Sequence, residues 1–153
     1  MVQPIHNRAY ETPPDAARLA YRESRDQIRS EIATFTAQIR AAEQLQMRLV
    51  YGALRVEAPV VKIGTSRRLA GRTGRLRRMP GCSLIAVMAG GYAEEREVHE
   101  RLARHRVKVV LTGHGHGEHF VICDDVVEWV NETRHAVGAP PLATDALLSQ
   151  YGV

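Results

Sequence analysis

Three apolar runs rich in β-branched residues lie close together in this chain, and they limit its fold more than any other feature. The first two, Val50–Val56 and Pro59–Ile63, are separated by a short turn, an arrangement that predicts a β-hairpin. The third, Ser83–Ala89, is almost continuously apolar, as is typical of a buried strand. We therefore expect a small three-stranded antiparallel sheet.

A long helix is expected before the sheet. Residues 15–47 contain neither glycine nor proline, and Thr12 can serve as N-cap because Pro13 follows it at the first helical position. Apolar residues recur along one narrow seam, which consists of Tyr21, Ile28, Ile32, Phe35, Ile39, Ala42 and Leu49. So narrow a seam fits a single partner, which is either a second copy of the chain in a homodimer or one face of the domain that follows.

Helical patterns also follow the hairpin. Thr65 or Ser66 can cap a helix that runs to about Met79, and further helices are expected over residues 93–106 and 124–138. The predicted fold class is α/β of the α+β type, in which helices flank the three-stranded sheet. The expected organisation is a flexible arm (1–12), the N-terminal helix (13–47), a compact domain (48–138) and a C-terminal tail (139–153).

The positive charge of the chain is concentrated in one segment. The 153 residues carry a formal net charge of +4, with a pI near 9.4. Six arginines and no acidic residue fall between residues 67 and 78: Arg67, Arg68, Arg72, Arg75, Arg77 and Arg78. Guanidinium groups bind phosphate in a bidentate manner, so the segment indicates a polyanionic partner. A GC-rich genome would give the same preference for arginine over lysine.

The remaining composition bears on the cellular setting. Two cysteines, Cys82 and Cys123, are too few for a disulfide framework or a thiolate zinc site. No apolar run is long enough to span a membrane, and the N-terminus lacks the apolar core of a signal peptide. A reducing, cytoplasmic setting is expected.

Several short motifs occur in a fixed order between Leu49 and Phe120. They are Tyr51 on the first run, Lys62-Ile63-Gly64 at the end of the second, Arg72, Glu95 four residues before His99, and the sequence Gly117-Glu118-His119-Phe120. As a set, these residues resemble the GIY-YIG endonuclease superfamily. They are most similar to a phage and bacterial subgroup whose signatures read VYxI, VKIGxT, R, ExxLH and GEWF.

The resemblance implies a small domain that hydrolyses phosphodiester bonds of DNA with one divalent metal ion, Mg²⁺ or Mn²⁺. It implies that Tyr51 helps to activate the attacking water, that Arg72 holds the scissile phosphate and that Glu95 is the acidic metal ligand. A lone carboxylate suffices for Mg²⁺ because that ion keeps several of its waters. Lys62 replaces the second family tyrosine, and it could bind phosphate or lower the pKa of Tyr51. His99, one turn after Glu95, either contacts the metal or phosphate or packs against the sheet.

Two rival functions remain open. The altered motifs also suit a catalytically inactive nucleic-acid-binding module that dimerises through the N-terminal helix. Alternatively, His114, His116 and His119 could bind Zn²⁺ together with His99 or His105, although the glycines between them favour a loop without metal. On the leading hypothesis, the other five arginines of the basic segment contact phosphates without reading bases, and sequence preference is low.

Overall fold

The computed structural model describes residues 32–55, 60–71, 74–78, 82–108 and 118–142. The strands are β1 (Leu49–Arg55), β2 (Val60–Ser66), β3 (Cys82–Ala89), β4 (Arg106–Val107) and β5 (His119–Val121). Residues 32–44 form an α-helix, followed later by α2 (Tyr92–Arg101) and α3 (Asp124–Ala136), with single 3₁₀ turns η2 (Arg75–Arg78) and η3 (Ala103–His105). The α+β class that the sequence predicts is confirmed.

The strands form one antiparallel sheet with the order β3-β1-β2-β5-β4. The predicted sheet of three strands is therefore too small. β5 pairs with β2 and covers the edge that a three-stranded sheet would leave open, and β4 pairs with β5 in turn. Strands of two and three residues carry too little alternation for their place in a sheet to be predicted from the sequence.

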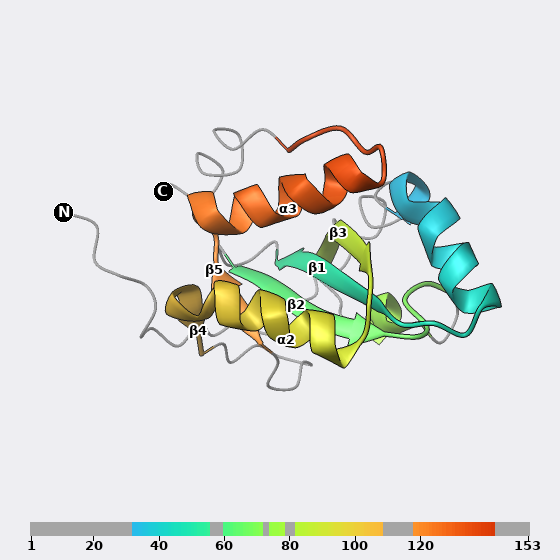
Figure 1. Ribbon diagram of the computed structural model, residues 1–153, viewed down its shortest axis with the longest axis horizontal. Coiled ribbons are helices and arrows are strands. Elements are labelled where there is room, and N and C mark those ends of the chain that lie inside the picture. The colour runs from blue at the N-terminus through green and yellow to red at the C-terminus, as the bar shows by residue number, and fades with distance from the viewer. Residues whose placement is uncertain (1–31, 56–59, 72–73, 79–81, 109–117, 143–153) are drawn as a thin grey trace, which may run out of the picture.

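Each face of the sheet has its own apolar core. Residues of α2 and α3 pack on one face, where Trp129 of α3 lies against Gly52 of β1. A Cβ on Gly52 would stand 3.1 Å from the Trp129 ring, so glycine allows this helix to approach the sheet closely. The other face is covered by the helix of residues 32–44 together with Leu69 and Leu76. Helices cover the sheet (Figure 1), and every residue of the interior strand β1, which lies between β3 and β2, is buried.

The helix of residues 32–44 uses its apolar seam within the domain. Phe35, Ile39 and Ala42 are 0%, 3% and 7% exposed, and they belong to the same core as Tyr51 of β1. This part of the seam therefore has its partner in the same chain. Residues 13–31, with the upstream part of the seam, lie outside the described residues, as do the arm and most of the tail. Dimerisation through them stays a prediction.

The prediction of a helix over residues 65–79 is wrong. β2 continues through Ser66, and the only helical turn in the described part of this segment is η2. The backbone N–H groups of Arg75 and Leu76 donate to the carbonyls of Arg68 and Leu69, seven residues back, which closes a wide loop. Gly71 has a φ of 99°, a conformation that interrupts a right-handed helix.

The other two predicted helices are confirmed with shorter bounds. α2 ends at Arg101, before the 3₁₀ turn η3, and α3 ends at Ala136. The two helices are joined on their outer sides by a bidentate pair in which Arg101 donates to Glu132 at 2.6 and 2.8 Å. Within the ranges described above, no helix is long and apolar enough to cross a membrane.

Candidate functional site

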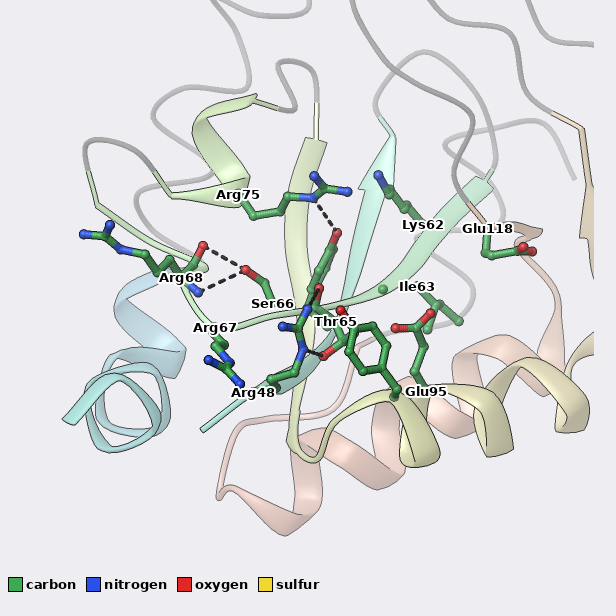
Figure 2. A pocket seen from close by; sticks show the side chains of 13 residues that line it. Arg48, Lys62, Ile63, Thr65, Ser66, Arg67, Arg68, Arg75, Glu95 and Glu118 are labelled. Atoms are coloured by element: carbon green, nitrogen blue, oxygen red, sulfur yellow. Dashed lines mark hydrogen bonds between the residues drawn. The ribbon is translucent and has the colours of Figure 1, made fainter. Parts of the chain in front are cut away.

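A cavity of about 600 Å³ opens beside the start of β1, the end of β2 and the N-terminus of α2 (Figure 2). Its lining consists of Arg48, Tyr51, Lys62, Ile63, Gly64, Thr65, Ser66, Arg67, Arg68, Arg75, Tyr92, Glu95 and Glu118. Arginines and lysine outnumber the two glutamates, so the cavity attracts anions. Figure 2 shows Lys62 and Arg75 on one side of this cavity, with Glu95 rising from α2 on another.

Tyr51 forms the floor of the cavity. It lies on β1 directly opposite Gly64 of β2 and is 1% exposed. Its hydroxyl accepts a long hydrogen bond, 3.4 Å, from Nε of Arg75. Burial raises the pKa of the Tyr51 phenol, and the neighbouring Arg75 offsets only part of that rise. Tyr51 is therefore a neutral phenol at physiological pH.

Lys62 enters the same cavity from β2. It lies two residues before Gly64, on the same side of the strand, and so reaches the region of Tyr51. Burial, followed by the positive charge of Arg75, lowers the pKa of the Lys62 amine. Of the two roles open to Lys62, lowering the pKa of Tyr51 gains no support here, because that pKa is raised and, among the described residues, Arg75 is the cation that opposes the rise.

Glu95 and His99 lie one turn apart on α2 but have different surroundings. Glu95 lines the cavity, whereas His99 is 8% exposed, does not line it and packs against Phe120. Nε2 of His99 lies 2.9 Å from the carbonyl oxygen of Ile63, which can only accept, so this nitrogen carries a proton. The same nitrogen is 3.8 Å from Oε1 of Glu95. His99 thus connects α2 to β2 behind the carboxylate.

The predicted phosphate-binding arginines fall into two groups. Arg67, Arg68 and Arg75 line the cavity, and all three are exposed. Arg72 and the side chains of Arg77 and Arg78 lie outside the described part of the chain. The structure therefore assigns a specific contact to Arg75, which sequence analysis had treated as a general phosphate ligand, because it donates to the Tyr51 hydroxyl.

Two lining residues were missed by sequence analysis, Arg48 and Tyr92. Arg48 donates from Nε to Oγ1 of Thr65 at 3.2 Å and from Nη2 to the Thr65 carbonyl at 3.3 Å. Its guanidinium carbon lies 4.4 Å from the centroid of the Tyr92 ring. Neither residue belongs to a recognisable motif, and only the pairing of β1 with β2 and the position of α2 bring them together.

The acidic groups of the cavity suit a hard cation that keeps most of its waters. Among the described residues, no three His, Cys, Asp or Glu side chains cluster as a metal site. Glu118 is already paired with Arg106, whose Nε is 3.0 Å from Oε2, so Glu95 is the more available carboxylate. One available carboxylate fits Mg²⁺ or Mn²⁺ and does not fit Zn²⁺, which takes several nitrogen or sulfur ligands.

The described part of the histidine loop gives no zinc site. His119 is 1% exposed within β5, directly opposite Lys62 of β2. His114 and His116 lie outside the described residues. The zinc hypothesis therefore stays a prediction without structural support from the residues described.

Comparisons with protein-family models, with curated proteins and with solved structures gave no match to this chain. The site is defined by its own geometry, a basic cavity whose floor is a buried tyrosine and whose wall holds one available carboxylate. These groups can bind a phosphate and a divalent cation together.

Proposed function

We propose that this chain is a divalent-metal-dependent endonuclease that hydrolyses phosphodiester bonds of DNA with low sequence preference. The observation that carries the proposal is the convergence of Tyr51, Lys62 and Glu95 on one cavity rimmed by exposed arginines. These residues come from β1, β2 and α2, which are separated in the sequence. The resemblance to the GIY-YIG superfamily supports the same reading.

The basic rim would bind the sugar-phosphate backbone. Arg67 and Arg68 are exposed at the cavity, where guanidinium groups can make paired hydrogen bonds to phosphate oxygens. None of these contacts distinguishes one base from another, so affinity should depend on salt more than on sequence.

Glu95 would hold the divalent ion, and Glu118 would be a weaker second ligand because Arg106 already pairs with it. When bound, the ion lowers the pKa of a coordinated water and neutralises charge that develops on the phosphate oxygens. His99 would keep Glu95 in place from behind, since its Nε2 lies near both that carboxylate and the Ile63 carbonyl.

Tyr51 and Lys62 would have separate roles toward the attacking water. Tyr51 remains protonated, so it would orient the attacking water through its hydroxyl, whose oxygen accepts a hydrogen bond from Arg75. Lys62, whose pKa is lowered, would accept the proton of that water in its neutral form. The water oxygen then bonds to phosphorus as the bond from phosphorus to the leaving oxygen breaks, and the leaving oxygen takes a proton from solvent. Arg75 lies where it can also contact a phosphate.

A second candidate is a nucleic-acid-binding module without catalysis. The raised pKa of Tyr51 favours it, because a neutral phenol is a poor base. The available carboxylate of Glu95 beside the basic rim disfavours it, since a negative charge at that point weakens phosphate binding unless a cation is present.

The test is conversion of supercoiled plasmid to nicked or linear forms in Mg²⁺ or Mn²⁺. Cleavage by the wild type should disappear with chelator, in Glu95→Gln and in Tyr51→Phe, and should fall less in Glu118→Gln. Glu97→Gln is the matched control, because Glu97 is an exposed acid two residues away on α2 that does not line the cavity. Binding of DNA without cleavage in either metal would favour the second candidate.

A further inference from the structure

The exposed aromatic side chain of Tyr92 lies at the rim of the cavity and does not pack in the apolar core. Tyr92 is 66% exposed and belongs to neither apolar core. Burying such a ring would be favourable, and an exposed ring beside a charged cavity is the arrangement that binding surfaces use. Its position in the cavity lining is shared with Tyr51 and Glu95.

One face of the Tyr92 ring is occupied by Arg48. The guanidinium carbon lies 4.4 Å from the ring centroid, a cation-π distance, and two hydrogen bonds to Thr65 hold the guanidinium there. Because two thirds of the residue stays exposed with one face covered, the opposite face is open to solvent. The ring is therefore a fixed, flat surface with one free side.

Arg48 also keeps donors for a ligand. Its Nε and Nη2 bond to Thr65, and within the described residues Nη1 has no hydrogen-bond partner. Nη1 carries two N–H groups, which suit a phosphate oxygen. The guanidinium thus lies over one face of the Tyr92 ring and the open aromatic face lies on the other, so a nucleotide whose base stacks on the open face would place its phosphate past the ring edge to reach Arg48.

We propose that Tyr92 and Arg48 form a nucleotide-binding site at the cavity rim, where one unpaired base stacks on Tyr92 while Arg48 binds its phosphate. The proposal rests on the endonuclease function above and deepens it by naming the substrate class, nucleic acid with an unpaired nucleotide at the cut. A base inside a duplex has both faces covered by its neighbours, so it cannot stack on Tyr92. Single-stranded or locally opened strands deliver such a base without that cost.

The experiment measures binding by fluorescence anisotropy in chelator, so that cleavage plays no part. The probes are labelled single-stranded oligodeoxythymidine, a strand of equal length whose central nucleotides are abasic, a duplex of equal length, and oligouridine. The wild type should bind oligodeoxythymidine more tightly than the abasic strand and the duplex. If oligouridine bound as tightly, the proposed site would accept RNA as well, because DNA and RNA both supply a base that can stack.

Substitutions separate stacking from charge. Tyr92→Ala should weaken binding to oligodeoxythymidine about 5- to 140-fold, which is the fold-change for loss of one stacked base, and should leave binding to the abasic strand unchanged. Tyr92→Phe should keep the wild-type affinity because the ring remains. Leu45→Ala, which removes a 69% exposed side chain that does not line the cavity, should have no effect.

A second readout reports contact at the ring itself. Trp129 is the only tryptophan and is 3% exposed, so its emission reports folding and changes little on binding. Tyr92→Trp should add an exposed emission that oligodeoxythymidine quenches and the abasic strand does not. If Tyr92→Ala bound every probe like the wild type, or if the wild type preferred the duplex, the proposed stacking site would be wrong. The proposed nuclease function would not be affected by that result. If the wild type bound no nucleic acid, the proposed function would fall as well.

Discussion

Tyr51 lies directly opposite Gly64, and a Cβ added to Gly64 would stand 2.9 Å from the Tyr51 hydroxyl oxygen and 3.1 Å from its Cζ. The glycine of the Lys62-Ile63-Gly64 motif therefore has a steric role. It lets the ring of Tyr51 lie across β2 so that the hydroxyl reaches the cavity and Arg75.

Gly64→Ala should reduce cleavage at least 10-fold because the tyrosine ring must move away from Arg75. Elsewhere in a strand, the same change would stabilise a protein by about 0.5–1 kcal/mol. Here the ring is 1% exposed and cannot turn aside freely, so a loss of stability of about 1–3 kcal/mol is expected instead. Urea unfolding followed by Trp129 emission measures the stability. Combining Gly64→Ala with Tyr51→Phe, which removes the atom nearest the added Cβ, should give less than the sum of the two effects on stability, and full additivity would contradict the steric link.

Arg75 should keep the pKa of Tyr51 lower than burial alone would make it. Burial raises that pKa and the Arg75 guanidinium lowers it, so Arg75→Gln should move it further upward. Ultraviolet titration of the phenols measures the shift, with Tyr51→Phe identifying the transition that belongs to this residue among the five tyrosines. Arg68→Gln is the control, since that side chain lines the cavity without bonding to Tyr51. An unchanged titration in Arg75→Gln would contradict the contact.

Lys62 should lower the stability of the fold near neutral pH. Its pKa is lower in the folded chain than the ordinary value near 10.4, so between these two pKa values the unfolded chain binds more protons. The free energy of unfolding therefore rises with pH in that window. Lys62→Met should be more stable than the wild type at pH 7, and the difference should vanish as the pH rises toward the ordinary pKa of lysine. Urea unfolding across pH tests this, and a less stable variant at pH 7 would contradict it. The variant should lose cleavage.

His99 should act by positioning. His99→Phe keeps the contact with Phe120 but leaves the Ile63 carbonyl without its donor, which costs about 1–3 kcal/mol of stability. It should also raise the Mg²⁺ concentration needed for cleavage, because Glu95 loses its neighbour. Saturating Mg²⁺ should restore most of kcat, and His99→Gln, which keeps an N–H donor, should be closer to the wild type. A kcat that stays low at saturating metal in both variants would mean that His99 takes part directly in the chemistry.

The exposed arginines should determine the salt dependence of DNA binding. The logarithm of affinity should fall linearly with the logarithm of salt concentration, and Arg67→Ala or Arg68→Ala should each reduce the slope by about 0.7–0.9 per lost phosphate contact. Arg40→Ala is the matched control, because Arg40 is exposed on the helix of residues 32–44 and does not line the cavity. Filter binding over a salt series measures the slopes. Equal slopes in all four proteins would mean that the arginine rim does not bind phosphate.

Local patterns predicted β1, β2, β3, α2 and α3 well, because each buries a face along its own length. The helix over residues 65–79 failed because capping residues and spaced leucines also suit a wide loop. In that loop, a backbone hydrogen bond joins Leu76 to Leu69, and both side chains pack in the core although they do not lie on one face of a helix. β4 and β5 were too short for their place in the sheet to be predicted, because pairing with β2 defines β5 and pairing with β5 defines β4.

The candidate site divides in the same way. The motifs drew attention to Tyr51, Lys62 and Glu95, all of which line the cavity, and to His99, which lies behind it. Arg48 and Tyr92 could not be found beforehand, since each is an ordinary residue until β1, β2 and α2 come together.

By itself, the sequence determined the three longer strands and the helices α2 and α3, the residue types available for chemistry and the place where positive charge is concentrated. These properties depend on neighbours a few positions away. Only the tertiary structure decided that Gly64 accommodates Tyr51, that Arg75 contacts that phenol and that Arg48 stacks on Tyr92. Strand register and helix docking create such contacts, and both arise from burial of apolar surface between residues far apart in the chain.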